Sequence, residues 1–289
     1  DLLGGELCVR PRPHDEAPRD LVRRSPDTTN RSDADPSGSA SPVPGPGDVK
    51  DPTTAFDVDL ARLRRRRTVK WSLYGPDVLA AWVVEMDFDV APVVRTALHE
   101  AVDRDDLGYV EADLSGLTAA CAHRLVSSSR WQVAPTRIFP ISDVLTGITL
   151  ALRSTTPDGS AVIVPTPAYP PFFDVVELAG RRVETAPMVL AAGRWCLDLD
   201  RIDTLLGEGA RSVLLCSPHN PTGRVFDAGE LDALAEVVDR HGARVVADEV
   251  HAPLVATGRR HLPYASLDEV AAGHTITVTS ASKAWNLAG

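Results

Sequence analysis

The sequence predicts an α/β protein in which a mostly parallel, buried β-sheet is flanked by helices. Short, continuously apolar runs recur along the chain, and amphipathic stretches with helical spacing separate them. Strands that are buried on both faces have this uninterrupted apolar character, and the helices between them supply the crossovers that parallel pairing requires. A hydrophobic content of 44% in a chain of 289 residues is enough for a large folded domain.

The expected helices begin at residues 91–104, where apolar side chains recur at helical spacing. Gly180 and Gly242 directly follow two later helical stretches, and glycine is typical of helix ends. The apolar runs between these stretches are the expected strands. The expected helices are 91–104, 117–126, 144–152, 171–178 and 228–241, and the expected strands are 161–164, 212–216, 244–247 and 275–279.

The first 52 residues differ in composition from the rest of the chain. They contain 9 of the 23 prolines and no aromatic residue, so they cannot bury enough apolar surface to offset their ordering entropy. We therefore expect a disordered, low-complexity extension over 1–52, an N-terminal segment over 53–90 and a large domain over 91–289. The sequence ends at Asn286–Gly289 without a terminal helix or polar tail, which leads us to expect that a C-terminal part of the fold is missing.

Charge and composition argue against several classes of partner. A net charge of −10 disfavours nucleic acid, and the one basic run, Arg64–Arg67, is expected to be a solvated helix end. No apolar run approaches the ~20 residues of a membrane span. We expect a protein of the reducing cytoplasm, without a zinc site or disulfide framework, because its four cysteines are widely scattered: Cys8, Cys121, Cys196 and Cys216.

Four residues with chemical function each stand shortly after one of the four expected strands. They are an aromatic ring, an amide, a carboxylate and an amine: Tyr169, Asn220, Asp248 and Lys283. Because ligands of parallel sheets bind beyond the carboxyl ends of the strands, we expect the four side chains to share one edge of the sheet. Together they match the requirements of pyridoxal 5'-phosphate (PLP).

The amine is the most informative of the four. The chain has three lysines, and only Lys283 follows an apolar strand, whereas Lys50 and Lys70 lie near the N-terminus. We therefore expect Lys283 to be the sole interior lysine. A lysine can form an imine with the aldehyde of PLP, which an arginine cannot do. The alternative is a lysine that only caps a strand.

The other three residues have alternatives of their own. Asp248 could raise the pKa of the pyridine nitrogen of PLP, or it could be a helix cap or loop acid. Asn220, in a turn between two prolines, could donate to the phenolic oxygen of the cofactor, or it could be an ordinary turn residue. Tyr169 could stack on the ring, or it could pack in the core. Glu249 is expected to point to the opposite face from Asp248.

A phosphate could be bound by two features. Residues 142–147 precede an apolar helix, so backbone N–H groups there could face an anion. Ser280 and Ser282 could add hydroxyl donors. No Walker or Rossmann glycine signature is present.

The motifs carry a resemblance to a known family. Ser-Pro-His-Asn220-Pro-Thr-Gly, Ala-Asp248-Glu-Val-His and Ser-Ala-Ser-Lys283 resemble, in order and separation, the class I/II aminotransferases of PLP fold type I. A narrower resemblance, to the MalY/PatB group of cystathionine β-lyase-like C–S lyases, covers about residues 56–289. It rests on Lys70-Trp71, Trp82-Val-Val-Glu-Met-Asp-Phe88, Gly108-Tyr109, Thr166-Pro-Ala-Tyr169 and Ser282-Lys283-Ala-Trp-Asn286. One departure is Val-Glu85, where the group commonly has Ala-Asp.

The resemblance implies an architecture. It predicts the PLP-transferase fold type I, with a mostly parallel seven-stranded sheet flanked by helices in the large domain. Segment 53–90 would be associated with a small domain, whose C-terminal part, including the arginine that binds the substrate carboxylate, would be missing. The resemblance also implies a homodimer with shared active sites.

The resemblance also implies roles for individual residues. Lys283 would be the Schiff-base lysine and proton shuttle, Asp248 would pair with the pyridinium nitrogen, Asn220 would contact the phenolic oxygen and Tyr169 would stack on the ring. His251 occupies a position at which the lyase group often has histidine. The phosphate would be held by Val144, Leu145, Ser280 and Ser282, with Tyr109 reaching it from the neighbouring subunit.

The function that these residues predict is β-elimination from L-cystathionine or a related cysteine S-conjugate, giving a thiol, pyruvate and ammonia. Transamination of amino acids is the alternative, because it shares every step up to the carbanion. A third possibility, of another class, is a non-catalytic or regulatory protein that keeps the PLP fold.

Overall fold

The computed structural model describes residues 58–109 and 114–288 of the chain. The chain divides into two units, Asp1–Gly47 and Asp48–Gly289, and the first of these lies outside the described residues. The disordered extension expected over 1–52 therefore also lies outside them. All of the described helices and strands belong to the second unit.

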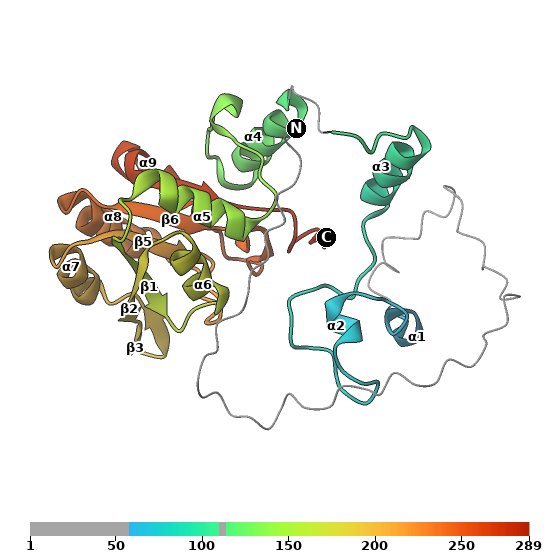
Figure 1. Ribbon diagram of the computed structural model, residues 1–289, viewed down its shortest axis with the longest axis horizontal. Coiled ribbons are helices and arrows are strands. Elements are labelled where there is room, and N and C mark those ends of the chain that lie inside the picture. Colours follow the sequence, from blue (N-terminus) through green and yellow to red (C-terminus); the bar gives the residue numbers. More distant parts are fainter. Residues whose placement is uncertain (1–57, 110–113, 289) are drawn as a thin grey trace, which may run out of the picture. The chain divides into compact units, whose positions relative to one another are not determined.

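A five-stranded parallel sheet lies between helices in the second unit (Figure 1). Every neighbouring pair in it is parallel, and the strands lie in the order β2-β1-β5-β6-β7. Because β1 has β2 on one side and β5 on the other, the strand order reverses there, which is where α/β sheets bind ligands. The strands are β1 (Ala161–Thr166), β2 (Arg182–Pro187), β5 (Ala210–Cys216), β6 (Arg244–Asp248) and β7 (Thr275–Val278).

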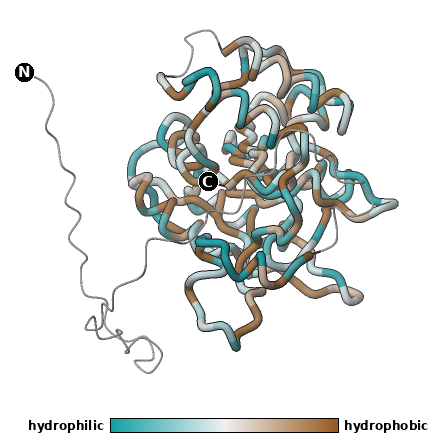
Figure 2. The backbone as a smooth tube through the Cα atoms, turned by 90° about the vertical axis from the view of Figure 1, so that its right-hand side faces the viewer, coloured by the Kyte–Doolittle hydropathy of each residue, from teal (hydrophilic) through white to brown (hydrophobic). Residues whose placement is uncertain are grey.

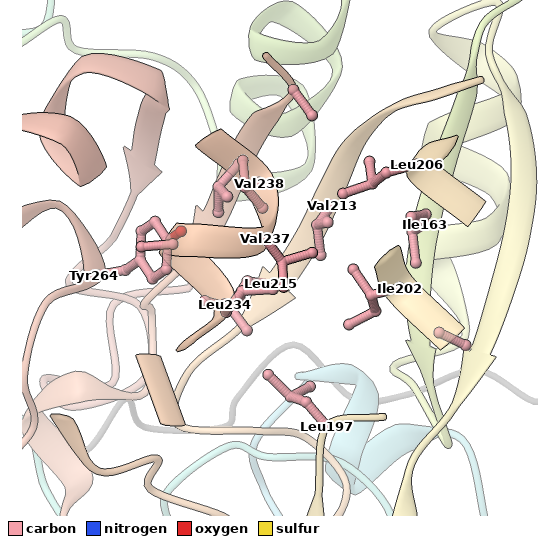
Figure 3. Packing of buried hydrophobic residues seen from close by; sticks show 14 of the residues in the cluster. Ile163, Leu197, Ile202, Leu206, Val213, Leu215, Leu234, Val237, Val238 and Tyr264 are labelled. Atoms are coloured by element: carbon pink, nitrogen blue, oxygen red, sulfur yellow. The ribbon is translucent and has the colours of Figure 1, made fainter. Parts of the chain in front are cut away.

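Helices cover both faces of this sheet, because side chains along each strand alternate between two apolar clusters. On one face, Val164, Leu214 and Val246 pack against α5 (Val144–Thr155) and α6 (Pro171–Leu178). On the other face the strands pack against α7 (Leu199–Gly207), α8 (Ala228–Arg240) and α9 (Glu269–His274). Figure 3 shows part of this second cluster, in which Ile163, Val213 and Leu215 meet residues of α7 and α8.

The number of strands in the sheet differs from the expectation. The resemblance implied seven, whereas the described residues place five in the parallel sheet. Two further short strands, β3 (Val189–Ala191) and β4 (Arg194–Cys196), pair with each other as an antiparallel hairpin. Their residues are exposed or half-buried, so they lack the apolar character of an interior strand. Ala192 and Gly193, both with positive φ, form the tight turn between them.

All five expected helices and four expected strands are present, with ends that shift by a few residues. The elements that were not expected are short or partly exposed. Strand β2 lies at the sheet edge and carries Arg182 and Glu184 among its exposed or half-buried positions, so it lacks an apolar run. Helix α9 has six residues, fewer than two turns, which is too short for a periodic signal. Figure 2 shows that hydrophobic and hydrophilic stretches alternate along the described backbone.

The described N-terminal part of the second unit contains helices joined by irregular segments and no strand. It contains two helices of one turn each and two longer ones that precede the sheet. These are α1 (Leu60–Leu63), α2 (Val69–Ser72), α3 (Pro92–Asp103) and α4 (Ser115–Ser129). Short 3-10 turns occur at η2 (Pro135–Arg137), η3 (Ala252–Leu254) and η4 (Tyr264–Ser266). Among residues 58–109 and 114–288, no helix combines the length and apolar character that crossing a membrane requires.

The close approach of α5 to the sheet depends on one glycine. A Cβ atom at Gly147 would lie 2.9 Å from Cγ1 of Val278 and would also overlap Cδ1 of Ile141. Gly147 therefore sets the first turn of α5 directly against the carboxyl end of β7. A larger residue would push the helix away from that edge.

We predict that Gly147→Ala lowers the free energy of unfolding by about 1–3 kcal/mol, because the added methyl overpacks the contact between α5 and β7. Gly116→Ala is the matched control, since Gly116 lies in the first turn of α4 with nothing within 4 Å of an added Cβ. The control is expected to be neutral or slightly stabilising. Urea unfolding followed by circular dichroism measures both, and equal effects of the two variants would contradict the role given to Gly147.

Candidate active site

The residues beyond three neighbouring strands are held together at the carboxyl edge of the sheet. The backbone N–H of Ser217, after β5, donates to the carbonyl of Asp248 at a distance of 2.9 Å. The N–H of Glu249, after β6, donates to the carbonyl of Val278, also at 2.9 Å. These bonds continue the ladders past the strands, so the segments that come after β5, β6 and β7 start from fixed positions.

Asp248 is the buried acid of this edge. It is the last residue of β6 and 4% exposed, and its Oδ1 accepts a hydrogen bond of 3.1 Å from the N–H of Val250. Burial raises the pKa of Asp248 to about 6. The bond from Val250 and the charge of Lys283 lower this pKa, and the charge of Glu249 raises it. By strand alternation Asp248 shares the face of Val246, which is the face covered by α5 and α6.

Glu249 points to the opposite face, as expected from the sequence. It is 3% exposed, and its carboxylate accepts a hydrogen bond of 2.9 Å from the N–H of Tyr264. Nε2 of His261 lies 3.0 Å from the other carboxylate oxygen. Two adjacent acids therefore have different surroundings. Glu249 is bound to the 261–264 segment, whereas the Asp248 carboxylate keeps one oxygen without a hydrogen bond from the described residues.

Lys283 lies beyond β7 in a turn over residues 281–286. Its side chain is half-buried, and among the described residues its amine has no hydrogen-bond partner. The positive charge of Lys283 lowers the pKa of both Asp248 and His251, so the amine is within electrostatic reach of the buried acid. The expectation that Lys283 and Asp248 lie at the same edge agrees with this arrangement.

The expectation of a single interior lysine is wrong. Lys70 is 6% exposed, more deeply buried than Lys283. Its ammonium group donates to the carbonyl of Glu85 at 2.7 Å and to both carboxylate oxygens of Asp87 at 2.9 Å. The sequence did not reveal this site because α2 has one turn and its partners lie 15 to 17 positions away. The two lysines differ in that Lys70 is fully paired with acceptors.

Asn220 lies in a braced loop after β5. The loop is closed by hydrogen bonds of 2.7 Å from the N–H of His219 to the carbonyl of Arg224 and of 2.8 Å from the N–H of Gly223 to the carbonyl of His219. The N–H of Asn220 also donates to Sγ of Cys216. The side-chain amide of Asn220 is half-buried and, within the described residues, has no partner. It is therefore free to bind a ligand.

His251 joins this loop to the end of β6. A hydrogen bond with the carbonyl of Pro218 raises the pKa of His251, but burial and the nearby charge of Lys283 lower it more strongly. The histidine is therefore held neutral beside the lysine. Burial likewise raises the pKa of the Cys216 thiol to about 12, so this cysteine remains a protonated packing residue.

The N-terminus of α5 reaches the same edge, because Gly147 in its first turn contacts Val278 at the end of β7. Asp143 caps the helix by accepting from the N–H of Thr146 at 2.9 Å. The first N–H groups of a helix have no acceptor inside it. That of Leu145 is directed at the Asp143 carboxyl and lowers its pKa, which leaves the N–H of Val144 as the group available to an anion. Ser280, just beyond β7, accepts from the N–H of Ser282 at 3.1 Å.

The two tyrosines are not brought into contact with these groups in the described part of the chain. Tyr169 comes after β1, is 36% exposed and packs edge-on against Phe172 at a ring separation of 5.5 Å. Tyr109 is fully exposed at the end of a described stretch. Their expected roles therefore stay predictions. The described residues also contain no group of histidine, cysteine and acidic side chains that could hold a metal ion.

Comparison with known families identifies the arrangement. The model of the family described as aminotransferase class I and II matches residues 83–289, which include the whole of the sheet and its carboxyl edge. The chain belongs to the class I and II aminotransferase family. This membership agrees with the parallel sheet and flanking helices, and it confirms the wider resemblance found in the sequence motifs.

Individual relatives within the family support the narrower resemblance. The chain is 39% identical over 231 residues to the cystathionine beta-lyase of Corynebacterium glutamicum, covering 80% of this chain and 61% of that protein. It is 33% identical to the cystathionine beta-lyase PatB of Bacillus subtilis, covering 77% of this chain and 59% of that protein. The chain thus spans about three fifths of the length of these relatives.

A solved structure of a relative has the same fold. The crystal structure of cystalysin from Treponema denticola, which contains a pyridoxal 5'-phosphate cofactor, superimposes with a TM-score of 0.73 at 28% identity. The match covers 78% of this chain and 59% of that one. It confirms the expected α/β architecture of this family member.

The sequence motifs did contain one site residue to which no role was assigned. Asn286 stands three positions after Lys283 in the motif shared with the lyase group, and its side chain binds the backbone of Met86. Both residues lie within motifs that carry the resemblance. Their pairing was not predictable because 200 positions separate them.

We predict a distinct effect of pH on the variant Asp248→Asn in protein without added ligand. Burial raises the pKa of this carboxyl from 3.8 to about 6, so between these values the folded state binds more protons than the unfolded state. The contribution of this carboxyl to the free energy of unfolding therefore falls as the pH rises from 3.8 to about 6. Asparagine removes the penalty, and the variant should gain on the order of 1–3 kcal/mol over the original protein by pH 7 but little at pH 4.

Urea unfolding at a series of pH values measures this difference. The two proteins must be compared at each pH, because burial also lowers the pKa of His219 to about 4. This histidine makes the free energy of unfolding rise with pH in both proteins, and the effect cancels in their difference. A stability difference that stays constant from pH 4 to pH 7 would show that Asp248 titrates normally.

Proposed function

We propose that this family member binds PLP through Lys283 and acts as a carbon–sulfur β-lyase on L-cystathionine or a related cysteine S-conjugate. The observation that carries the proposal is a lysine amine without a hydrogen-bond partner that lies in electrostatic reach of a buried, otherwise uncompensated carboxyl. Burial of an acid at the end of a central strand costs stability unless a cationic ligand pairs with it.

The donors and acceptors at this edge fit such a cofactor. Asp248 offers a buried acceptor for a ring N–H, and a cation there would lower the pKa that burial has raised. Asn220 offers a free amide donor, which suits a phenolic oxygen. The N–H of Val144 and the hydroxyls of Ser280 and Ser282 suit a phosphate, and the N–H of Leu145 could serve it as well if it turned from the Asp143 carboxyl. Tyr169, at the end of β1, would cover one face of the ring.

When bound, PLP supplies an electron sink that stabilises negative charge at the α-carbon of an amino acid. The amine of Lys283 would hold the cofactor and, once the amine of the substrate has replaced it there, would be free to take the proton from the α-carbon. Asp248 keeps the ring nitrogen protonated, and Asn220 orients the ring through its opposite side. His251, held neutral beside Lys283, does not compete as a cation for Asp248.

Elimination is favoured over transamination by the named relatives, two of which are cystathionine beta-lyases. The family as a whole is described as aminotransferases of class I and II, so amino transfer is the second candidate. Both reactions share proton removal by the lysine and differ in their later steps. In elimination a thiolate would leave the β-carbon and take up a proton, and one water molecule would hydrolyse the rest of the substrate to pyruvate and ammonia.

We also propose that the active protein is a homodimer in which Tyr109 reaches the phosphate of the neighbouring subunit. Support comes from exposed apolar side chains that a partner could cover. Helix α3 has no buried residue, and three of its apolar residues are more than half exposed: Val93, Leu98 and Val102. Tyr109 is fully exposed six positions after this helix ends.

We predict that the full-length protein with PLP has the yellow absorbance of a lysine-bound cofactor and that borohydride attaches the cofactor to Lys283. Lys70 is the internal control, because its ammonium is occupied by Asp87 and Glu85 and should remain unlabelled in the same peptide map. Lys283→Arg keeps the charge but cannot form the bond, so absorbance should be lost and turnover should fall by about 10³-fold or more. Attachment to Lys70 would overturn the assignment.

We predict that incubation of the full-length protein with L-cystathionine releases thiol and pyruvate in equal amounts, without any keto acid being added. The measurement is coupled detection of pyruvate alongside thiol titration. Amino transfer that depends on an added keto acid and yields no pyruvate would establish the aminotransferase instead. Cofactor binding without either reaction would identify a non-catalytic member of the family.

A further inference from the structure

Asn286 makes a two-point contact with the backbone of Met86. Its side-chain Oδ1 accepts from the N–H of Met86 at 3.1 Å, and its Nδ2 donates to the carbonyl of the same residue at 3.1 Å. One amide side chain thus satisfies both polar groups of one residue, in the manner of a strand ladder. The contact joins the turn after β7 to a segment that lies about 200 positions earlier in the chain.

The segment on the Met86 side is itself fixed. Over residues 85–88, which we term the strap, all four backbone carbonyls accept hydrogen bonds from side chains. Nη1 and Nη2 of Arg66 donate to the carbonyls of residues 86–88 at 3.1–3.3 Å. Lys70 donates to the carbonyl of Glu85 at 2.7 Å. Charged donors thus bind every carbonyl of the strap, and such charge-assisted hydrogen bonds are stronger than neutral ones.

The segment on the Asn286 side carries Lys283. This turn has few other attachments: Ser280 accepts from the N–H of Ser282, and the ring of Trp285 lies 5.2 Å from the guanidinium of Arg124. The side chain of Lys283 contributes no hydrogen bond to the described residues. The position of the amine is therefore determined by the backbone of the turn.

The backbone at Asn286 is also unusual. Its φ is +56°, in the left-handed region that asparagine tolerates better than most residues. Glycine would tolerate the same backbone but has no amide with which to bind Met86. Asparagine both tolerates the positive φ and binds Met86. A glycine at this position would therefore test the contact without straining the backbone.

We propose that Asn286 is a positioning residue for Lys283, acting by docking the lysine-bearing turn on the backbone of Met86. The proposal rests on the proposed function, because Lys283 is the residue that the contact would hold in place. Asn286 is given no contact with the cofactor or the substrate. It acts by fixing the point at which the turn ends, three residues beyond the amine.

Three variants of the full-length protein test the proposal. Asn286→Gly permits the positive φ but removes both hydrogen bonds. Asn286→Asp keeps an acceptor for the N–H of Met86 and loses the donor to its carbonyl. Thr68→Val is the matched control, because Thr68 binds the strap through the side chain of Glu85 at 2.6 Å and makes no contact with Met86.

The first measurement is amide hydrogen exchange of a peptide spanning residues 85–88, which needs no activity. Loss of both bonds in Asn286→Gly should speed exchange of the Met86 N–H about tenfold or more, and Asn286→Asp should lie between it and the original protein. Thr68→Val should leave the Met86 N–H unchanged. Equal exchange in all four proteins would overturn the contact itself.

The second measurement is the pH titration of the cofactor's visible absorbance together with the separate values of kcat and KM. A displaced amine should shift the titration and lower kcat about tenfold in Asn286→Gly, with a smaller change in KM. Partial recovery in Asn286→Asp supports positioning. Faster exchange at Met86 with an unchanged titration and kcat would reduce Asn286 to a structural role and overturn the proposal.

The proposed function and the role of Asn286 fail on different results. Absence of cofactor absorbance in the original protein, or borohydride labelling away from Lys283, would refute the proposed function. Normal absorbance and labelling in the original protein, with Asn286→Gly indistinguishable from it, would refute only the role of Asn286.

Discussion

The arrangement of the carboxyl edge of the sheet depends on the burial of one carboxyl. Asp248 ends a central strand at a point where water is excluded and only one backbone N–H binds it. Burial raises its pKa, so the ionised form is disfavoured until a positive charge approaches. The cation supplied by the chain is the amine of Lys283, which remains without a partner of its own. The buried carboxyl of Asp248 would therefore be stabilised in its ionised form by a cationic ring bound at this edge.

The parallel sheet explains why these groups meet. Each strand delivers the segment after it to the same edge, and alternation directs Asp248 toward α5 and Glu249 away from it. Gly147 allows α5 to approach β7 closely, which aligns the first turn of the helix with the same edge. Local rules of strand geometry and one close contact therefore account for most of the arrangement.

Much of this was predictable from sequence, because apolar runs and the residues just after them are local signals. Helices α5, α6 and α8, strands β1, β5, β6 and β7, and the proximity of Asp248 to Lys283 depend on such signals. Contacts between distant segments were not predictable: Lys70 is buried because Asp87 folds back on it, and Asn286 finds Met86 across most of the chain. The hairpin of β3 and β4 was not predictable either, because its residues are exposed or half-buried and form no apolar run.

The Asn286–Met86 contact also bears on the order in which the protein acquires its structure. The strap and the cations that bind it are made before the sheet, whereas the lysine turn follows all five strands that the structure describes in the parallel sheet. Joining segments so far apart carries a large loop-closure entropy unless the intervening chain has already condensed. The contact between Asn286 and Met86 is therefore expected to close only after the described strands have condensed into the sheet.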